Sequence, residues 1–352
     1  MKGLILAGGL GTRLRPLTFS QQKQLIPVAN KPILFYVIED LIDAGIDEIG
    51  IVVGPNREQV VETVTSAQWQ ADIQFIEQPE PKGLAHAIQV AEDFVADSPF
   101  LMYLGDNMLK EGVVEHVEDF LQDDAAASIL LTSVSDPQEF GIAELNDKNE
   151  IVQLVEKPEH PPSSFAVIGI YMFRPAILQA VKEITPSWRN QLEIVDAIQW
   201  LIDHGYRVRS SFVQGWWKDT GKPEDIIHAN RLVLDEISSK NRGDVTDSRV
   251  HGRVAIGSGS RVEDNSRIKG PVVIGDNCRI SNSYVGPYTS IGDGCEIMDT
   301  EIEDSVVMQG ASIAGVDRIV ESLIGRDVKI MRDHALPKGN KLVLGDSSEV
   351  RI

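Results

Sequence analysis

Residues 4–18 read LILAGGLGTRLRPLT, an apolar run that passes directly into a loop rich in glycine. The run predicts a short buried strand, because continuous apolar residues that end at glycine suit a strand covered on both faces. Glycines let backbone N–H groups approach an anion without obstruction by side chains. An arginine adds a planar, permanently charged fork that fits phosphate oxygens. The candidate anion ligands in this loop are Gly8, Gly9, Gly11, Thr12 and Arg13.

The spacing of these glycines differs from that of the two commonest nucleotide-binding loops. The dinucleotide pattern has a third glycine where this chain has Leu14, and the Walker pattern needs a Gly-Lys-Ser/Thr sequence that is absent. A tight turn without any ligand is the alternative for a glycine loop after a strand. The next polar segment, QQKQLIPVANKPIL, carries Lys23 and Gln24, and Lys23 can reach the same anion. This context favours a polyphosphate site over a bare turn.

Residues 1–235 alternate strand-like apolar runs with amphipathic stretches. Strands are predicted at GLILAG, EIGIVVG, IQFIEQ and FLMYLGD, and apolar residues at spacings of three and four predict helices over 32–45 and 84–95. The alternation predicts an α/β domain with a Rossmann-like, mixed but mostly parallel sheet that helices cover on both faces. Ligands of such sheets bind at the carboxyl ends of the strands.

The period changes in the last third of the chain. A helix is predicted to lead out of the first domain over 222–240, and the linker is placed at 236–249. Residues 250–352 are predicted to form a left-handed parallel β-helix of hexapeptide repeats with a C-terminal tail, because an aliphatic residue recurs about every six residues. The repeat positions are Val250, Ile256, Val262, Ile268, Ile274, Ile280, Val285, Ile291, Ile297, Ile302, Val307, Ile313, Ile319, Ile324 and Ile330.

The predicted β-helix has two possible roles. It is expected to serve as a module for stability and homo-oligomerisation, since a solenoid leaves faces or ends that need cover. The alternative is a second catalytic site, because acyltransferases also use this architecture. His251 and His334 are the only possible bases near it, and neither belongs to a recognisable site motif.

Composition narrows the class of protein. The chain has 352 residues, enough for about two domains, and a net charge of −20 argues against nonspecific binding to nucleic acid or to anionic membranes. Its N-terminus has no signal pattern and no run approaches the roughly 18 apolar residues of a membrane helix, so a cytoplasmic location is expected. The two cysteines, Cys278 and Cys295, are expected as unpaired buried or edge thiols, because no metal-binding spacing accompanies them.

The segments LAGGLGTRLRPLT and KQLIPVANKPIL resemble the signature of the sugar-1-phosphate nucleotidylyltransferases. The resemblance covers most of residues 1–235 by motif and the remainder by architecture. Within the family, the chain is most similar to the long form that uses dTTP and glucose 1-phosphate. The resemblance implies Mg²⁺-dependent transfer of a nucleotidyl group from dTTP to glucose 1-phosphate, with release of pyrophosphate.

The resemblance also implies roles for individual residues. The implied catalytic residues are Arg13, Lys23 and Lys157. Those implied at the nucleotide are Gly8, Gly9, Gly11, Thr12 and Gln24, with Gln78 and Gly83 of QPEPKGLAHA at the base. Those implied at the sugar phosphate are Gly141, Glu156, Lys157, Tyr171 and Arg189. The implied metal ligands are Asp106 of LGDN and Asp219 of WWKDTG. Phe140 departs from the pattern, because the family usually has tyrosine before the conserved-motif glycine at this point.

The residue types suit this chemistry independently of the family. Magnesium prefers oxygen ligands and is usually held by one or two carboxylates together with substrate phosphates. A sugar phosphate is already an anionic nucleophile, so the motifs need no general base. Three alternatives stay open: synthesis of UDP-, ADP- or GDP-sugars, an amino-sugar transferase whose β-helix acetylates, and a regulatory subunit that binds nucleotide sugars without turnover.

Overall fold

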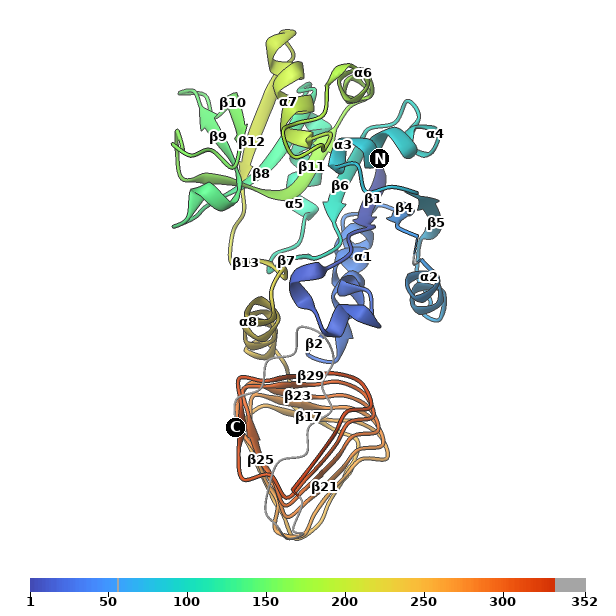
Figure 1. The fold of residues 1–352 in the computed structure, drawn as a ribbon, viewed down its shortest axis with the longest axis vertical. Coiled ribbons are helices and arrows are strands. Elements are labelled where there is room, and N and C mark those ends of the chain that lie inside the picture. Colours follow the sequence, from blue (N-terminus) through green and yellow to red (C-terminus); the bar gives the residue numbers. More distant parts are fainter. Residues whose placement is uncertain (56, 333–352) are drawn as a thin grey trace. The chain divides into compact units, whose positions relative to one another are not determined.

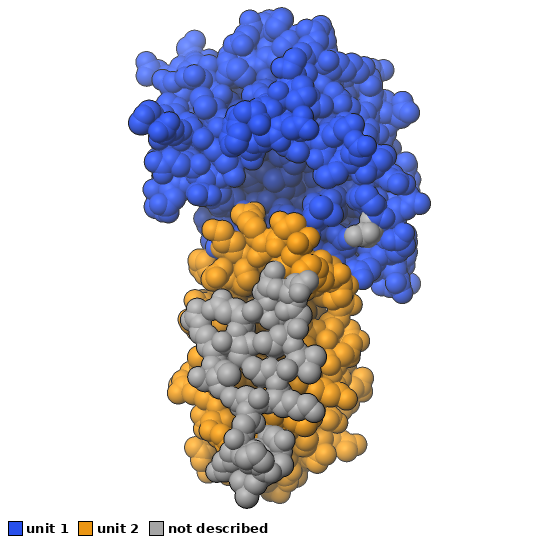
Figure 2. Space-filling model, in the orientation of Figure 1, with its two compact units in different colours: residues 1–10, 22–25, 33–219 blue, residues 11–21, 26–32, 220–352 orange. Residues whose placement is uncertain are grey.

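The computed structural model describes residues 1–55 and 57–332, so His334 and the rest of the predicted tail lie outside the described residues. The chain divides into two compact units (Figure 2). Unit 1 comprises residues 1–10, 22–25 and 33–219, and unit 2 comprises residues 11–21, 26–32 and 220–352. The division differs from the predicted boundary at 235, because the helix α8 (Pro223–Leu234) belongs with the C-terminal part of the chain.

Unit 1 is built on a nine-stranded mixed sheet (Figure 1). Its parallel half follows the order β5-β4-β1-β6 and confirms the four predicted strands. The strands of this half are β1 (Lys2–Ala7), β4 (Glu48–Val53), β5 (Asp72–Glu77) and β6 (Phe100–Leu104). The long strand β11 (Phe165–Phe173) pairs antiparallel with β6 and joins the remaining strands to the sheet. These are β8 (Ala127–Ser133), β9 (Gly141–Leu145), β10 (Ile151–Glu156) and β12 (Val208–Phe212).

Helices cover both faces of this sheet, as predicted. Alternate residues of β1 point to opposite faces, so Leu4 and Leu6 lie in one core and Ile5 and Ala7 in the other. The first core is closed by α3 (Leu84–Val90), α6 (Ala176–Glu183) and α7 (Ile194–Asp203). The second is closed by α1 (Ile33–Asp43), α2 (Glu58–Thr65) and α5 (Val114–Gln122). The helix expected over 84–95 is two helices, because Ala91 leaves the helical region between α3 and α4 (Glu92–Val95).

The short elements of the chain follow the loops. Two strands form a small antiparallel ribbon, β7 (Asn107–Leu109) with β13 (Trp217–Asp219). Four turns are 3-10 helices: η1 (Thr12–Leu14), η2 (Leu17–Phe19), η3 (Lys23–Leu25) and η4 (Pro137–Glu139). A hairpin joins β2 (Pro27–Val28) to β3 (Lys31–Pro32). None of the helices among the described residues is long and apolar enough to cross a bilayer.

The C-terminal part of unit 2 is a parallel β-helix with three sheets, whose coils Figure 1 shows almost end on as stacked triangles. One sheet holds β14 (Lys240–Asn241), β17 (Val254–Ile256), β20 (Val272–Ile274), β23 (Thr289–Ile291), β26 (Val306–Val307) and β29 (Leu323–Ile324). The second holds β15 (Asp244–Val245), β18 (Arg261–Glu263), β21 (Arg279–Ser281), β24 (Glu296–Met298), β27 (Ser312–Ala314) and β30 (Lys329–Met331). The third holds β16 (Arg249–His251), β19 (Arg267–Lys269), β22 (Tyr284–Val285), β25 (Glu301–Glu303) and β28 (Ile319–Val320).

The hexapeptide repeat is confirmed in the core of this β-helix. All the predicted repeat positions, from Val250 to Ile330, lie in one apolar cluster or pack against it. The first coil begins earlier than the predicted linker end, because β14 and β15 already pair with β17 and β18. Cys278 and Cys295 are free, buried thiols in the same core. Burial raises the pKa of both thiols, and that of Cys295 reaches about 12.

Candidate active site

The carboxyl ends of the parallel strands of unit 1 bring three loops together. The Gly105 N–H donates to the Leu6 carbonyl at 3.0 Å, and the Gln78 N–H donates to the Val53 carbonyl at 2.9 Å. A Cβ on Gly54 would lie 2.9 Å from the Gly8 carbonyl oxygen, so the loops after β1 and β4 touch through their glycines. This edge is where ligands of open α/β sheets bind.

Gly8 and Gly9 make room for two predicted ligands. A Cβ on Gly8 would lie 3.3 Å from Gln78 Oε1, and one on Gly9 would lie 3.2 Å from Lys23 Cε. Distances of this size are tighter than ordinary van der Waals contact. The two glycines therefore let the amide of Gln78 and the stem of Lys23 approach the backbone of the loop.

Lys23 and Asp106 form an ion pair in unit 1. The Lys23 ammonium donates to Asp106 Oδ2, and the two side chains are only 17% and 11% exposed. Asn107 donates from Nδ2 to the other oxygen of Asp106, at 3.2 Å. The predicted pyrophosphate lysine and the predicted metal carboxylate therefore neutralise each other in this state of the protein.

Asp219 comes to the same place through the ribbon β7–β13. In that ladder Asp219 lies opposite Asn107, the residue directly after Asp106. Trp217 of β13 donates from Nε1 to Asn107 Oδ1 at 2.7 Å, which fixes the two strands to each other. The ring of Phe140 meets the Trp217 ring edge-on, with centroids 5.8 Å apart. The residue that departs from the family pattern thus packs against the strand that carries Asp219.

Gln78 is oriented by two hydrogen bonds from its amide nitrogen. Nε2 lies 3.3 Å from the Gly83 carbonyl and 3.0 Å from His86 Nδ1. Since an amide nitrogen can only donate, Nδ1 of His86 accepts, and the amide oxygen of Gln78 stays on the Gly8 side. Burial, with the charge of Lys82, lowers the pKa of His86, which favours this neutral form.

Gly83 allows the loop before α3 to pass close to another loop. Its φ is 112°, in the region that side chains disfavour, and a Cβ there would collide with the backbone of Leu192. The Leu192 N–H also donates to the Lys82 carbonyl, at 2.7 Å. The predicted base-reading segment is therefore locked against the segment that follows Arg189.

Glu156 and Arg189 form the centre of the predicted sugar site. Arg189 Nη2 lies 2.8 Å from Glu156 Oε1 and 2.9 Å from Glu193 Oε1. Burial raises the pKa of the Glu156 carboxyl, and the Arg189 charge opposes that rise. Glu156 pairs with Gly141 between β10 and β9, and a Cβ on Gly141 would lie 3.2 Å from Glu156 Oε2. Arg189 is thus engaged with carboxylates here, and its direct effect is to orient Glu156.

Tyr171 is buried on β11 near this pair. Its side chain is 3% exposed and stacks on Phe173 at 5.8 Å between ring centroids. Burial raises the pKa of the Tyr171 hydroxyl, and the charge of Glu156 adds to the rise. The hydroxyl therefore stays protonated and can act as a hydrogen-bond donor.

Lys157 presents a free cation from a strained backbone. Its φ is 45°, in the left-handed region, which costs a residue with a side chain roughly 1–2 kcal/mol. Its N–H donates to the Phe140 carbonyl at 3.0 Å, and its exposed ammonium pairs with no carboxylate in the described part of the chain. Strain of this kind is often held at functional positions.

Gly11, Thr12 and Arg13 belong to unit 2. Gly11 has a φ of 61° and caps η1, with its carbonyl accepting from the Leu14 N–H at 2.9 Å and from the Thr18 hydroxyl at 2.7 Å. Leu14 is buried, whereas Thr12 and Arg13 are exposed. Within residues 1–55 and 57–332, the Arg13 guanidinium has no carboxylate partner. The turn therefore fixes the backbone and leaves Arg13 available for an anion.

Gln24 is 1% exposed, and its side-chain oxygen has no hydrogen-bond partner among the described residues. The position of a Cβ on Gly105 would be 3.4 Å from Gln24 Cγ, so Gln24 lies beside the residue before Asp106. The described residues hold no group of three His, Cys, Asp or Glu side chains arranged for a metal. The oxygen atoms of this region come from two aspartates and an unsatisfied amide.

The structure adds four residues that the motifs did not single out. Each one holds a predicted residue in place: His86 holds Gln78, Asn107 holds Asp106, Glu193 holds Arg189, and Gly54 admits the Gly8 loop. Three of them stand inside or next to a quoted motif, so proximity in the sequence was the available signal. Their partners could not be read from the sequence, because each contact spans a turn or crosses strands.

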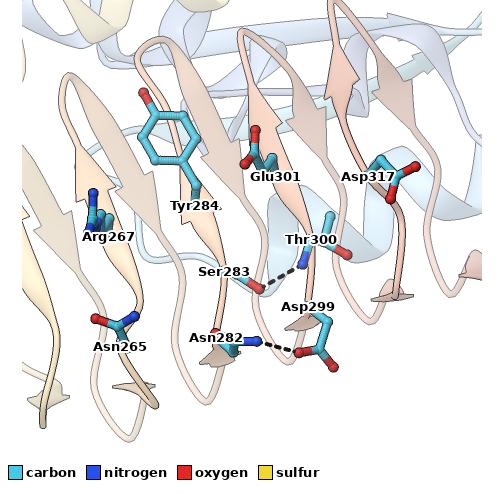
Figure 3. Close-up of a pocket in the computed structure, with 9 residues that line it drawn as sticks. All are labelled: Asn265, Arg267, Asn282, Ser283, Tyr284, Asp299, Thr300, Glu301 and Asp317. Carbon is cyan, nitrogen blue, oxygen red and sulfur yellow. Dashed lines mark hydrogen bonds between the residues drawn. The ribbon is translucent and has the colours of Figure 1, made fainter.

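A polar groove of about 420 Å³ runs along one corner of the β-helix (Figure 3). Equivalent side chains of successive coils line it, including Arg267, Tyr284 and Glu301. Asn282 donates to Asp299 there at 2.6 Å. None of the nine lining residues is histidine, so the groove does not contain His251, the base considered for an acyltransferase site.

The comparisons with known proteins agree with this arrangement. The nucleotidyl transferase family model matches residues 2–236. A glucose-1-phosphate thymidylyltransferase of Streptomyces griseus is 48% identical over 100% of this chain and 99% of its own length. The low-salt glycan biosynthesis nucleotidyltransferase Agl11 of Haloferax volcanii is also 48% identical, over 100% of both chains.

Solved structures match the N-terminal two thirds. A crystal structure from Bacillus anthracis, assigned as a glucose-1-phosphate thymidylyltransferase, is 34% identical with a TM-score of 0.63, over 68% of this chain and 98% of that one. UDP-glucose pyrophosphorylase in complex with UDP-glucose is 25% identical with a TM-score of 0.61, over 67% and 99%. Together with the family model, these relatives show that the chain belongs to the nucleotidyl transferase family.

Proposed function

We propose that this protein transfers a thymidylyl group from dTTP to glucose 1-phosphate, giving dTDP-glucose and pyrophosphate. Support comes from the similarity over the full length to the Streptomyces griseus enzyme of that name. The observation that carries the proposal is the pairing of Lys23 with Asp106 at the carboxyl edge of the sheet. That pair puts a cation for phosphate and a carboxylate for metal side by side.

The proposed reaction is an in-line displacement at phosphorus. An oxygen of the sugar phosphate forms a bond to the α-phosphorus of the nucleotide, while the bond from that phosphorus to the β-phosphate oxygen breaks. Pyrophosphate leaves with the electron pair of the broken bond. No proton has to be removed from the nucleophile, so the protein's task is to position two anions and to neutralise the charge that moves to the leaving group.

The cations divide this task among them. Lys23 and Arg13 are proposed to hold the leaving pyrophosphate, and Lys157 is proposed to hold the sugar phosphate. When Lys23 turns to phosphate, Asp106 loses its partner and gains a site for a divalent cation. The free ammonium of Lys157 and the free guanidinium of Arg13 need no such exchange.

The residues present fit Mg²⁺. Asp106 and Asp219 offer carboxylate oxygens, which this hard ion prefers, and Asp219 lies opposite the neighbour of Asp106 in the ribbon. Two carboxylates are too few to enclose the ion, and this suits a cation that keeps waters and takes its other ligands from substrate phosphates. When bound, Mg²⁺ would neutralise phosphate charge during transfer.

Gln78 is proposed to read the base. Its amide nitrogen is occupied by Gly83 and His86, so its oxygen is the group left for a ligand. Thymine and uracil carry an N–H at position 3 that an oxygen can accept from, whereas cytosine carries no hydrogen there. The methyl group that separates thymine from uracil is worth only about 1–3 kcal/mol in an apolar pocket, so some use of UTP is expected.

Glu156 is proposed to accept hydrogen bonds from the sugar hydroxyls, with Tyr171 and Gly141 beside it. The carboxylate is oriented by Arg189, which leaves Oε2 on the Gly141 side. A homo-oligomer formed through the β-helix also stays a prediction, and sedimentation of the whole protein tests it.

The experiment is a measurement of pyrophosphate release for each pairing of dTTP, UTP, ATP and GTP with different sugar 1-phosphates, with Mg²⁺ and with a chelator. We expect metal-dependent turnover that is highest with dTTP and glucose 1-phosphate. Highest turnover with another pair would move the substrate assignment and keep the chemistry. No turnover with any pair would overturn the proposal and favour a protein that only binds nucleotide sugars.

A further inference from the structure

Unit 2 contains two short segments from the N-terminal part of the chain, residues 11–21 and 26–32. They flank residues 22–25, which carry Lys23 and belong to unit 1. Lys23 is only two residues from Gln21, and the chain can move little over that distance without displacing it. Contacts that hold the two segments within unit 2 therefore bear on the position of Lys23.

Asn230 of α8 is the centre of one such set of contacts. Its side chain is fully buried, and its Oδ1 accepts from the Ala29 N–H and from the Ser290 hydroxyl, both at 2.9 Å. Its Nδ2 donates to the Tyr288 carbonyl at 2.9 Å. One amide thus joins the hairpin β2–β3, the helix α8 and a coil of the β-helix.

The hairpin turn itself is shaped to meet that coil. Ala29 and Asn30 have φ values of 47° and 66°, which is the left-handed conformation at both turn positions. The Asn30 side chain donates from Nδ2 to the Ile291 carbonyl of β23 at 2.6 Å. Alanine seldom adopts this conformation, and its N–H is held there by Asn230.

The last coils of the β-helix hold the other segment. Arg326 donates from Nε to Gln21 Oε1 at 3.0 Å, and Gln21 is 8% exposed. Next to it, a Cβ on Gly325 would lie 3.2 Å from Leu17 Cδ2, so Leu17 packs directly over that glycine. The segment that begins with Gly11 and contains Arg13 is therefore attached to the coil at 325–326.

We propose that Asn230 and Arg326 are positioning residues for nucleotidyl transfer. By holding residues 11–21 and 26–32 on the β-helix, they fix Arg13 within one segment and Lys23 between the two. The β-helix then has a part in turnover that is separate from oligomerisation and from any activity of its own. This inference rests on the proposed function, because Arg13 and Lys23 are the phosphate-binding cations of that reaction.

The test uses the whole protein and two variants that each remove one contact. Asn30→Gly keeps a residue suited to the left-handed backbone and loses the bond to Ile291. Arg326→Ala changes an exposed side chain and loses the bond to Gln21. We expect kcat for pyrophosphate release to fall by about tenfold or more in each, since a small misplacement of a catalytic group can cost about 10²-fold. The KM for glucose 1-phosphate should change little, because neither segment carries a predicted sugar ligand.

Two controls separate positioning from general damage to the fold. Arg318→Ala breaks an ion pair with Glu303 on the same β-helix and touches neither segment, so it should keep the parent kcat. Arg326→Lys keeps a donor for Gln21 and should restore much of the lost kcat. Hydrogen exchange of peptides within 11–32 should speed up in Asn30→Gly and Arg326→Ala and stay at the parent rate in Arg318→Ala.

The outcomes distinguish the two proposals. A parent without activity on any substrate pair would overturn the proposed function and the positioning role together. An active parent whose Asn30→Gly and Arg326→Ala variants keep its kcat and its exchange rates would overturn the positioning role alone. Equal losses in Arg318→Ala and Arg326→Ala would also overturn it, since they would indicate a general effect of the β-helix on stability.

Discussion

The amide nitrogen of Gln78 lies 3.0 Å from Nδ1 of His86, and this contact decides which way the Gln78 oxygen points. Nδ1 can accept only while the imidazole is neutral, and burial lowers the pKa of His86. The fold therefore prefers the neutral form, and the contact is present at neutral pH and lost as the pH falls through the lowered pKa. A residue far from any phosphate thus controls the group proposed to read the base.

This relationship predicts a pH dependence of nucleotide binding. The KM for dTTP should be flat from pH 8 down to about 6.5, the ordinary pKa of histidine, and should rise below that range. His86→Gln keeps an oxygen that can accept and does not titrate, so its KM should stay flat. His204→Gln, a change at an exposed histidine, serves as the control. The same rise at low pH in the parent and in His86→Gln would contradict the role given to His86.

The ion pair of Lys23 with Asp106 predicts two variants with different metal responses. Asp106→Asn and Lys23→Met should each lower kcat by about 10²–10³-fold, the usual loss for a preorganised charged group. Asp106→Asn should also raise the Mg²⁺ concentration needed for half-maximal rate, whereas Lys23→Met should not. The measurement is a Mg²⁺ titration of pyrophosphate release.

Asp124→Asn provides the matched control for this pair, because Asp124 is an exposed carboxylate that pairs with Arg207. It should behave as the parent does. An unchanged Mg²⁺ requirement in Asp106→Asn would remove Asp106 from the proposed metal ligands.

Arg13 and Arg15 provide a second matched comparison within one turn. Arg13 has no carboxylate partner in the described structure, whereas Arg15 lies over the Phe19 ring at 4.8 Å. Arg13→Ala should lose at least about 10²-fold in kcat, and Arg15→Ala should stay within about twofold of the parent. Steady-state rates at saturating substrates decide this, and equal rates for the two variants would exclude a catalytic role for Arg13.

Arg189 is expected to act on the sugar through Glu156. Arg189→Ala leaves Glu156 without its main neutralising charge, so the pKa of that carboxyl should rise further and the carboxylate should protonate at higher pH. The KM for glucose 1-phosphate should rise about tenfold or more, since a hydrogen bond to a charged group is typically worth about 1.5–3 kcal/mol. The rise should steepen as the pH falls.

The control for Arg189 is Lys182→Ala, which breaks an exposed pair with Glu92. If Arg189→Ala lowers kcat for both substrates and leaves the KM for glucose 1-phosphate unchanged, Arg189 contacts the reacting phosphates directly and the indirect role is wrong.

Much of the fold could be predicted because burial sets the sequence period. The four strands of the parallel half and the repeat from Val250 to Ile330 are both visible as regular apolar spacing. The first coil was not visible, since Val245 is the only aliphatic residue of β14 and β15 that packs against the core. A repeat signal needs several members before it can be recognised.

The candidate site could be predicted less completely, because its residues are held by partners distant in the chain. Lys23 and Asp106 were both found by motif, yet their ion pair joins residues 83 positions apart. The attachment of residues 11–32 to the β-helix depends on Asn230 and Arg326, which no motif contains. Tertiary distances of this kind are not encoded by local spacing.

The two buried thiols of the β-helix have a practical consequence. Cys278 donates to the Gly292 carbonyl and Cys295 to the Met308 carbonyl, at 3.0 and 3.2 Å. A protonated, covered thiol reacts with an alkylating reagent only when the coils around it separate. The rate of alkylation at these two positions therefore records how often neighbouring coils of the solenoid come apart, and it does so in the native protein without any added label.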